Sequence, residues 1–277
     1  MLIHSDWHMH SEASYDSQLP LAEIEEKAHE YGFEKIGITD HANFNDRKFL
    51  TDLENSAKSV KELKKTNPNV VLGVELTPIE KPEFDYIQIH GVRDGYEAPS
   101  APLPYDIELA QTKEQLIALG VQYAVGAAHW RVDSPNARIL PHDLEAEIRE
   151  WYRQQIWLAC DNRVTILGHP WCNVNWYDDF SVIPHSMNLE IAAALKEHGK
   201  YMECNSCFFR SSRTTETFRR QYAEFLREVH ELGIPITYGS DSHNAYAPYH
   251  ADTEMYLLAA GFRDGDIVGL QEEALWK

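Results

Sequence analysis

The chain has 277 residues, of which 43% are hydrophobic and 11% aromatic, a composition typical of a globular protein with a sizeable core. Its formal net charge of -19 repels polyphosphate and anionic lipid, so we expect neither a nucleic-acid partner nor a membrane-surface partner. The sequence shows no basic leader and no apolar run of ~18 residues, which predicts a cytoplasmic location.

Short β-rich runs alternate with helix-like runs along most of the chain, a pattern typical of a parallel α/β architecture. The expected strands are 2–10, 35–41, 70–76, 122–129, 163–169, 200–206 and 235–241. The expected helices are 21–32, 47–66, 113–119, 142–160, 187–198 and 215–232. Because no internal repeat and no flexible linker separates these runs, we predict a single domain over 1–277.

The segment 77–121 is longer than a simple connection between a strand and a helix. Within it, the extended run 84–91 follows the third strand without an intervening helix, so we expect it to pair beside that strand. The proline-rich stretch 97–106 predicts an exposed loop. Since connections of this length are usually functional, we expect the insertion to lie near the site and to influence the choice of substrate.

The opening motif "DWHMH" places Asp6, His8 and His10 at alternate positions. Residues two apart in a strand share a face, so the two imidazoles form a candidate metal half-site. Asp6 lies one step deeper, and we expect it to accept a hydrogen bond from a ligand imidazole. The motif "SDSH" repeats this spacing with Asp241 and His243.

Residue types that bind metals fall at the ends of nearly all the expected strands. They are His8 and His10, His41, Glu75, His129, His169, and Asp241 with His243. The carboxyl ends of parallel strands meet at one mouth, so these side chains predict a centre of two or three divalent ions, Zn²⁺, Mn²⁺ or Fe²⁺. His90 also ends an extended run and is the alternative to His129, whereas Asp40 points to the other face of its strand and is not counted as a ligand.

Five motifs, "DWHMH", "ITDH", "GVE", "LGHP" and "GSDSH", follow one another over 6–243 and resemble those of the PHP family, named for polymerase and histidinol phosphatase. The resemblance implies a distorted (β/α)7 TIM-like barrel with a trinuclear metal centre at the carboxyl ends of its strands. The implied ligands are His8, His10, Glu75 and Asp241 for one ion, Glu75, His129 and His169 for the second, and Asp16, His41 and His243 for the third.

The expected activity is hydrolysis of a phosphate ester, most simply a small-molecule monoester. A water bridging two metals has its pKa lowered toward ~7, which makes hydroxide available as the nucleophile. We expect Asp241 to supply the proton to the leaving group, and Arg210 to anchor the phosphate, with Arg131 as the second choice. The segment "MECNS" resembles a Glu-x-Asn segment of the family, so Glu203 and Asn205 are expected to face the mouth.

Two other functions remain open at this point. An HxH strand with a late Asp also resembles the amidohydrolase superfamily, which would imply hydrolysis of an amide or carboxylic ester. That superfamily commonly carries a carboxylated Lys on a central strand, where this chain has Glu75, His129 and His169. A non-catalytic metal-binding barrel is the third possibility, although such a barrel would be expected to have lost ligands. These patterns specify neither the substrate nor the number of subunits.

A CxxC motif and three tryptophans also allow a structural or functional interpretation. Cys204 and Cys207 form a lone CxxC, for which a redox or zinc-knuckle role is a weak alternative. Three tryptophans flank the fourth and fifth strand ends, namely Trp130, Trp171 and Trp176. We expect them to pack between barrel and helices rather than to form an aromatic wall for a ring-bearing substrate.

Overall fold

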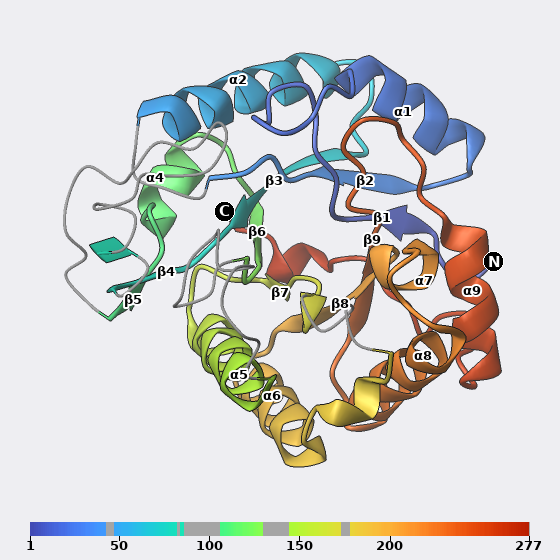
Figure 1. The fold of residues 1–277 in the computed structure, drawn as a ribbon. Coiled ribbons are helices and arrows are strands. Elements are labelled where there is room, and N and C mark those ends of the chain that lie inside the picture. Colours follow the sequence, from blue (N-terminus) through green and yellow to red (C-terminus); the bar gives the residue numbers. More distant parts are fainter. Residues whose placement is uncertain (43–46, 82–83, 86–105, 130–143, 173–177, 277) are drawn as a thin grey trace.

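Seven parallel strands around a common axis form the centre of the fold in the computed structural model (Figure 1). The structure describes residues 1–42, 47–81, 84–85, 106–129, 144–172 and 178–276. The strands are, in the order in which they neighbour one another, β1 (Ser5–Asp6), β2 (Lys35–Ile38), β3 (Val70–Leu76), β6 (Tyr123–Gly126), β7 (Ile166–Leu167), β8 (Tyr201–Asn205) and β9 (Ile236–Gly239). Their carboxyl ends therefore point the same way.

The first and last strands meet, which curves the sheet into a barrel. The backbone N–H of Trp7 donates to the carbonyl of Tyr238 at 2.9 Å. Beyond the strands, the N–H of Asp241 donates to His8 at 2.7 Å, and that of His10 to Ser242 at 2.9 Å. The expected distorted (β/α)7 barrel is thereby confirmed, and the segments that follow its first and last strands meet at its mouth.

Helices surround the barrel on the outside (Figure 1). They are α1 (Leu21–Glu30), α2 (Arg47–Leu63), α4 (Lys113–Ala118), α5 (Leu144–Cys160), α6 (His185–Glu197), α7 (Cys207–Arg210), α8 (Glu216–Glu231) and α9 (His250–Ala259), with 3-10 turns η2 (Phe180–Val182) and η3 (Glu272–Ala274). In α8 the Thr215 side chain caps the first turn, and Phe218, Tyr222 and Phe225 form a buried stripe at helical spacing. Among the described helices, none has the length and apolar character that a membrane span requires.

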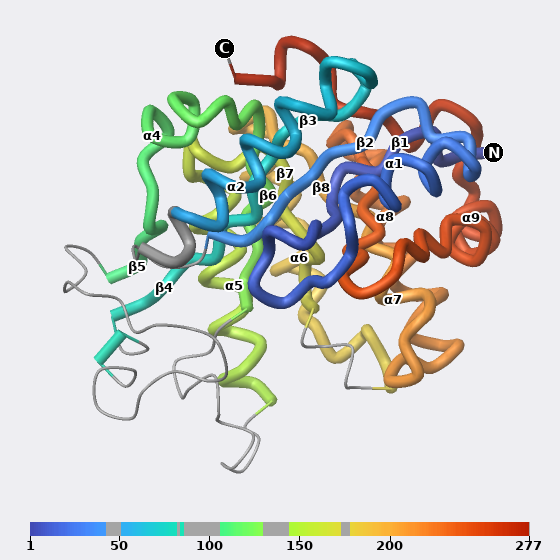
Figure 2. The backbone as a smooth tube through the Cα atoms, turned by 90° about the horizontal axis from the view of Figure 1, so that it is seen from above, coloured from blue at the N-terminus to red at the C-terminus, as the bar shows by residue number. Residues whose placement is uncertain are grey.

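The insertion after β3 departs from the sequence-based expectation. A small antiparallel ribbon of β4 (Ile79–Glu80) and β5 (Ile107–Glu108) lies outside the barrel, as both views show (Figures 1 and 2). The expected extended run 84–91 is wrong in its described part, because residues 84–85 are helical. An ion pair between Lys81 and Asp85, 2.6 Å apart at helical i,i+4 spacing, stabilises this turn. Residues 86–91 lie outside the described residues.

Other boundaries differ from the pattern for local reasons. The expected first strand is shorter, because the chain at His8 to His10 pairs with its neighbours only at single residues. The expected fifth strand is shorter because His169, at its predicted end, adopts a φ of 24°. The short helix α7 and the helix α9 were not predicted. The six expected helices are all present within a few residues of their predicted bounds.

A tyrosine fills the barrel below the mouth. Tyr123, at the start of β6, is fully buried, and its hydroxyl donates to the carbonyl of Trp7 at 2.7 Å. Two glycines make room for its ring. A Cβ at Gly37 would lie 1.8 Å from the hydroxyl oxygen, and a Cβ at Gly73 would lie 2.4 Å from the ring carbon that bears it. The barrel interior is therefore packed here.

Replacing Gly37 with alanine is expected to lower the free energy of unfolding by about 1–3 kcal/mol, because the new methyl group overpacks against Tyr123. In a Tyr123→Phe background the same replacement should cost less, since the nearest clashing atom is the hydroxyl oxygen. Denaturant unfolding of the four members of this double-mutant cycle measures the difference. Equal costs in both backgrounds would contradict the packing argument.

Candidate metal centre

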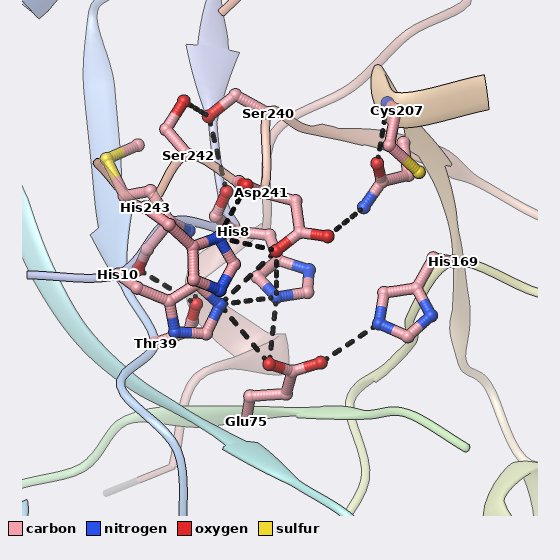
Figure 3. Close-up of polar contacts among 12 residues, drawn as sticks. His8, His10, Thr39, Glu75, His169, Cys207, Ser240, Asp241, Ser242 and His243 are labelled. Carbon is pink, nitrogen blue, oxygen red and sulfur yellow. Dashed lines mark hydrogen bonds and ion pairs between the residues drawn. The ribbon is translucent and has the colours of Figure 1, made fainter. Parts of the chain in front are cut away.

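The structure brings the side chains expected as metal ligands together at the mouth of the barrel. Figure 3 shows His8, His10, Glu75, His169, Asp241 and His243 directed toward one another; Glu75 lies on β3, and the others follow the ends of β1, β7 and β9. Three groups of potential ligand atoms result: His8, His10 and Glu75; Glu75, His129 and His169; and His10, Asp16, His41 and His243.

Glu75 stands between two of these groups and is almost fully buried. Its Oε2 lies 3.2 Å from Nε2 of both His8 and His10. Its Oε1 lies 3.0 Å from Nε2 of His169 and 3.4 Å from Nε2 of His129. Oε2 also lies 3.1 Å from Nδ1 of His41. The two oxygens of this carboxylate thus face separate sets of imidazoles, an arrangement that suits a carboxylate between two cations.

The third group is built around Asp16, which lies in the loop after β1. Its Oδ2 is 3.2 Å from Nε2 of both His41 and His243. The His10 ring stacks on both of these imidazoles, with ring centroids 4.4 Å and 4.2 Å away. The third group therefore adjoins the first through His10.

Asp241 lies beside the first group. Its Oδ1 is 3.3 Å from Nε2 of His10 and 3.7 Å from Nε2 of His8. Asp241 adopts a φ of 54°, in the left-handed region that is unfavourable for residues with a side chain. His169 shares this strain with a φ of 24°. Backbone strain of this kind concentrates at functional sites, where it holds a side chain in a required direction.

The donor set fits divalent cations of the Zn²⁺, Mn²⁺ and Fe²⁺ type. The three groups contain only imidazoles and carboxylates, a set these ions bind well. The Nε2 atoms of His8 and His10 lie 3.3 Å apart and face the same carboxylate oxygen. Within the described part of the chain, Oε2 of Glu75 and Nδ1 of His41, 3.1 Å apart, have no hydrogen-bond partner despite being buried. A cation placed among these atoms would give the converging lone pairs the partner that they otherwise lack.

The charges within the centre reinforce this fit. Burial raises the pKa of Glu75, but the imidazoles of His41, His8 and His129 lower it well below its usual range. Burial lowers the pKa of His8, but Glu203, Glu75 and Asp241 raise it well above its usual range. Glu75 is therefore ionised, and without metal His8 holds protons on both ring nitrogens, whereas burial lowers the pKa of His129 to about 3 and leaves that ring neutral. Metal binding must displace one of the His8 protons.

His243 allows a prediction for the metal-free protein. Burial lowers its pKa, but Asp16 and Asp241 raise it from 6.5 to about 9. A raised pKa stabilises the fold fully below pH 6.5, and this stabilisation is lost as the pH rises through about 9. We expect the free energy of unfolding of metal-free protein to fall by roughly 1–3 kcal/mol over that interval. Denaturant titrations across the interval, repeated with Asp16→Asn, provide the measurement; an equally steep fall in the variant would contradict the assignment.

Asp6 does not have the role expected from the sequence. Its carboxylate accepts from the backbone N–H of Ser240 at 2.9 Å and from the hydroxyl of Tyr246 at 3.1 Å, which ties β1 to the end of β9. The acceptor for the His8 ring is Glu203 on β8, whose Oε1 lies 2.7 Å from Nδ1. Asp6 shares a strand with His8 and points deeper, whereas the longer Glu203 side chain reaches the ring from another strand. The alternating pattern predicted that Glu203 faces the mouth but not which ring it meets.

Several remaining predictions can be placed. Asp40 accepts from the N–H and hydroxyl of Ser11, at 2.6 and 2.8 Å, and belongs to none of the three groups. Trp171 is fully buried and its indole donates to Asn188 at 2.9 Å, so its packing role is confirmed. His129 lies with Nδ1 2.7 Å from the hydroxyl of Thr77. Four residues named in the sequence analysis lie outside the described residues, namely His90, Trp130, Arg131 and Trp176.

The CxxC and the expected phosphate anchor have different surroundings. Cys204 is buried in the hydrophobic core, whereas Cys207 forms a side-chain hydrogen bond with Cys172. None of these three cysteines is in a disulfide bond. Arg210 ends α7, is exposed, and stacks on the ring of Tyr249 with 4.9 Å between guanidinium carbon and ring centroid. No carboxylate in the described part of the chain forms an ion pair with Arg210.

A parallel seven-stranded barrel with histidines and carboxylates at its mouth defines a class of metal-binding barrel proteins. The sequence model of the PHP domain matches residues 6–207. The chain belongs to the PHP domain family, which confirms the resemblance seen in its five motifs.

Comparison with solved structures supports the fold. Histidinol phosphate phosphatase from Lactococcus lactis subsp. lactis, solved with zinc, L-histidinol and phosphate, is 20% identical, with a TM-score of 0.71 and 100% of both chains covered. A putative histidinol phosphatase from Listeria monocytogenes is 16% identical, with a TM-score of 0.63, covering 89% of this chain and 99% of its own. No curated protein sequence matches the chain. At these identities the structural similarity establishes a shared barrel.

Proposed function

We propose that this metal-dependent phosphatase hydrolyses a small phosphate monoester at a centre of two or three divalent ions, zinc, manganese or iron. The observation that carries the proposal is Glu75, whose Oε2 faces three imidazoles, of His8, His10 and His41, and whose Oε1 faces two others, of His129 and His169. Two cations separated by one carboxylate suit the displacement of an ester from phosphorus. Membership of the PHP domain family supports this chemistry over that of an amidohydrolase.

The proposed ligands follow the geometry of the three groups. His8, His10, Glu75 and Asp241 would hold one ion; Glu75, His129 and His169 a second; and Asp16, His41 and His243 a third. When bound, such ions neutralise phosphate oxygens and lower the pKa of water toward ~7. The protein itself then has to orient the ester, exclude bulk water and move one proton.

Asp241 is proposed to move that proton. Burial raises its pKa, but His8, His10 and His243 lower it well below its usual range, so the carboxylate is ionised. An ionised carboxylate can accept a proton from the attacking water and return it to the leaving alkoxide. Its Oδ2 lies 3.4 Å from the amide nitrogen of Asn205, which orients this oxygen away from His10.

Arg210 is proposed as the phosphate anchor outside the metal centre. It ends α7, which directly follows β8, and the ring of Tyr249 supports its guanidinium. Because no described carboxylate pairs with it, the guanidinium fork is available for two parallel hydrogen bonds to phosphate oxygens. The long segment 77–121 is proposed to contribute to substrate choice, as expected from its length.

Metal content and ester hydrolysis test the proposal together. Elemental mass spectrometry of protein purified without chelator should give two or three equivalents of zinc, manganese or iron, and a reduced value for the His8→Ala/His10→Ala variant. The loaded protein should then release phosphate from a panel of small monoesters. L-histidinol phosphate belongs in this panel, because the similar Lactococcus lactis barrel is a histidinol phosphate phosphatase.

The panel also includes carboxylic esters and amides as alternative substrates. Hydrolysis of these compounds without phosphate release would favour an amidohydrolase-like activity instead. Protein that holds metal but acts on none of the compounds would favour a non-catalytic barrel. A metal content near zero that excess metal cannot raise would overturn the proposed centre.

A further inference from the structure

Glu203 is a buried carboxylate that touches two of the three ligand groups at once. It lies on β8 with about 1% of its surface exposed. The Nδ1–H of His8, in the first group, donates to its Oε1 at 2.7 Å. The backbone N–H of His169, in the second group, donates to its Oε2 at 2.5 Å. Asn205 donates to the same Oε2 at 3.2 Å.

The barrel is shaped to admit this side chain. A Cβ at Gly239, on the neighbouring strand β9, would lie 1.9 Å from Oε1 of Glu203 and 2.6 Å from Cβ of His8. Only a residue without a side chain leaves space for both groups to meet there. The contact between Glu203 and His8 is therefore a feature of the packed barrel wall rather than of a free surface.

Glu203 determines which nitrogen of His8 faces the centre. A carboxylate can only accept hydrogen bonds, so Nδ1 of His8 must carry the proton that it donates. The proton that a metal can displace is then the one on the other ring nitrogen, Nε2, and this is the nitrogen that lies 3.2 Å from Oε2 of Glu75. The backbone of His169, held in its left-handed conformation, is fixed by the second oxygen.

We infer that Glu203 is a positioning residue that joins the two ligand groups sharing Glu75 and leaves the third group unaffected. The inference rests on the proposed metal centre. Within the described part of the chain, the hydrogen bonds of Glu203 go to His8, His169 and Asn205, and none reaches Asp16 or His41. Its loss should consequently weaken two of the three metal positions and spare the other.

The substitution Glu203→Gln tests this pattern with almost no change in shape. The amide of Gln has only one oxygen acceptor. Its NH₂ group therefore faces either the His8 ring or the two donors of His169 and Asn205, and the hydrogen bonds on that side are lost. The substitution Asp6→Asn is the matched control. It makes the same chemical change in a fully buried carboxylate near His8 whose partners are backbone N–H groups and the Tyr246 hydroxyl.

Zinc binding to metal-free protein, titrated against a chromogenic chelator, is the measurement. In Glu203→Gln we expect zinc affinity to fall by about 10–100-fold at the position whose hydrogen bond is lost, one of the two that share Glu75, while the position at Asp16, His41 and His243 keeps wild-type affinity. Asp6→Asn should keep wild-type zinc affinity at all positions, even if the unfolding temperature of its metal-free form falls. Circular dichroism checks that each variant folds; if Glu203→Gln does not, Glu203→Asp, which keeps the charge but shortens the reach, is judged by the same criterion.

The outcomes separate this inference from the proposed function. Wild-type protein without zinc sites would contradict the proposed centre itself. Wild-type protein with its sites, and a folded Glu203→Gln that binds equally well at all of them, would overturn only the positioning role. A uniform loss over all positions, or an equal loss in Asp6→Asn, would also overturn it, because it would indicate general destabilisation.

Discussion

Replacing Glu75 with alanine is expected to remove the two metal ions proposed to share it and to lower kcat/KM for a phosphate monoester by roughly 10³-fold or more. The reason is geometric, since the two oxygens of this one carboxylate face separate sets of imidazoles. The loss also leaves converging imidazoles without the negative charge that holds them together. Elemental analysis and phosphate release on the same preparation measure both effects.

Glu80→Ala is the control for this replacement. Glu80 is another fully buried glutamate, five residues further on, and it pairs with Arg153 outside the barrel mouth. Its loss should lower stability while leaving the metal content in place. If Glu75→Ala kept its metal and its activity, the bridging assignment would have to be abandoned.

Replacing Arg210 with alanine should raise KM for phosphate monoesters by about 10–100-fold with a smaller change in kcat, as expected when a charge-assisted pair of hydrogen bonds to phosphate is lost. The KM of Arg210→Lys should lie between the values of the wild type and Arg210→Ala, because an ammonium group keeps the positive charge but cannot form the two parallel hydrogen bonds of a guanidinium group. Steady-state kinetics measure the effect, with Arg213→Ala as a control from the same segment. An unchanged KM in Arg210→Ala would show that this arginine is a surface residue.

The barrel and the set of candidate ligands could be predicted from the sequence because both depend on local order. Alternation along β-strands fixes which side chains share a face, and parallel strands bring their carboxyl ends together. That reasoning placed His8, His10, Glu75 and His169 at one mouth, as the structure does. The family resemblance added Asp16, whose loop position gives no periodic signal.

The partner of the His8 ring could not be predicted in this way. Periodicity gives the face of Glu203 and of Asp6 but not their reach across the barrel, which depends on side-chain length and on the space left at Gly239. The helical turn at 84–85 was missed for a similar reason, because a side-chain ion pair stabilises it within an apolar run. Contacts between distant segments decide such details.

The meeting of the first and last strands has a consequence for how the protein is made. The ligand groups combine His8 and His10, near the start of the chain, with Asp241 and His243, more than two hundred residues later. During synthesis on the ribosome, a chain that emerges from its N-terminus exposes the first histidines long before the last ones exist. In the proposed centre, a fully ligated ion would thus be available only to a chain that has been translated through its last strand.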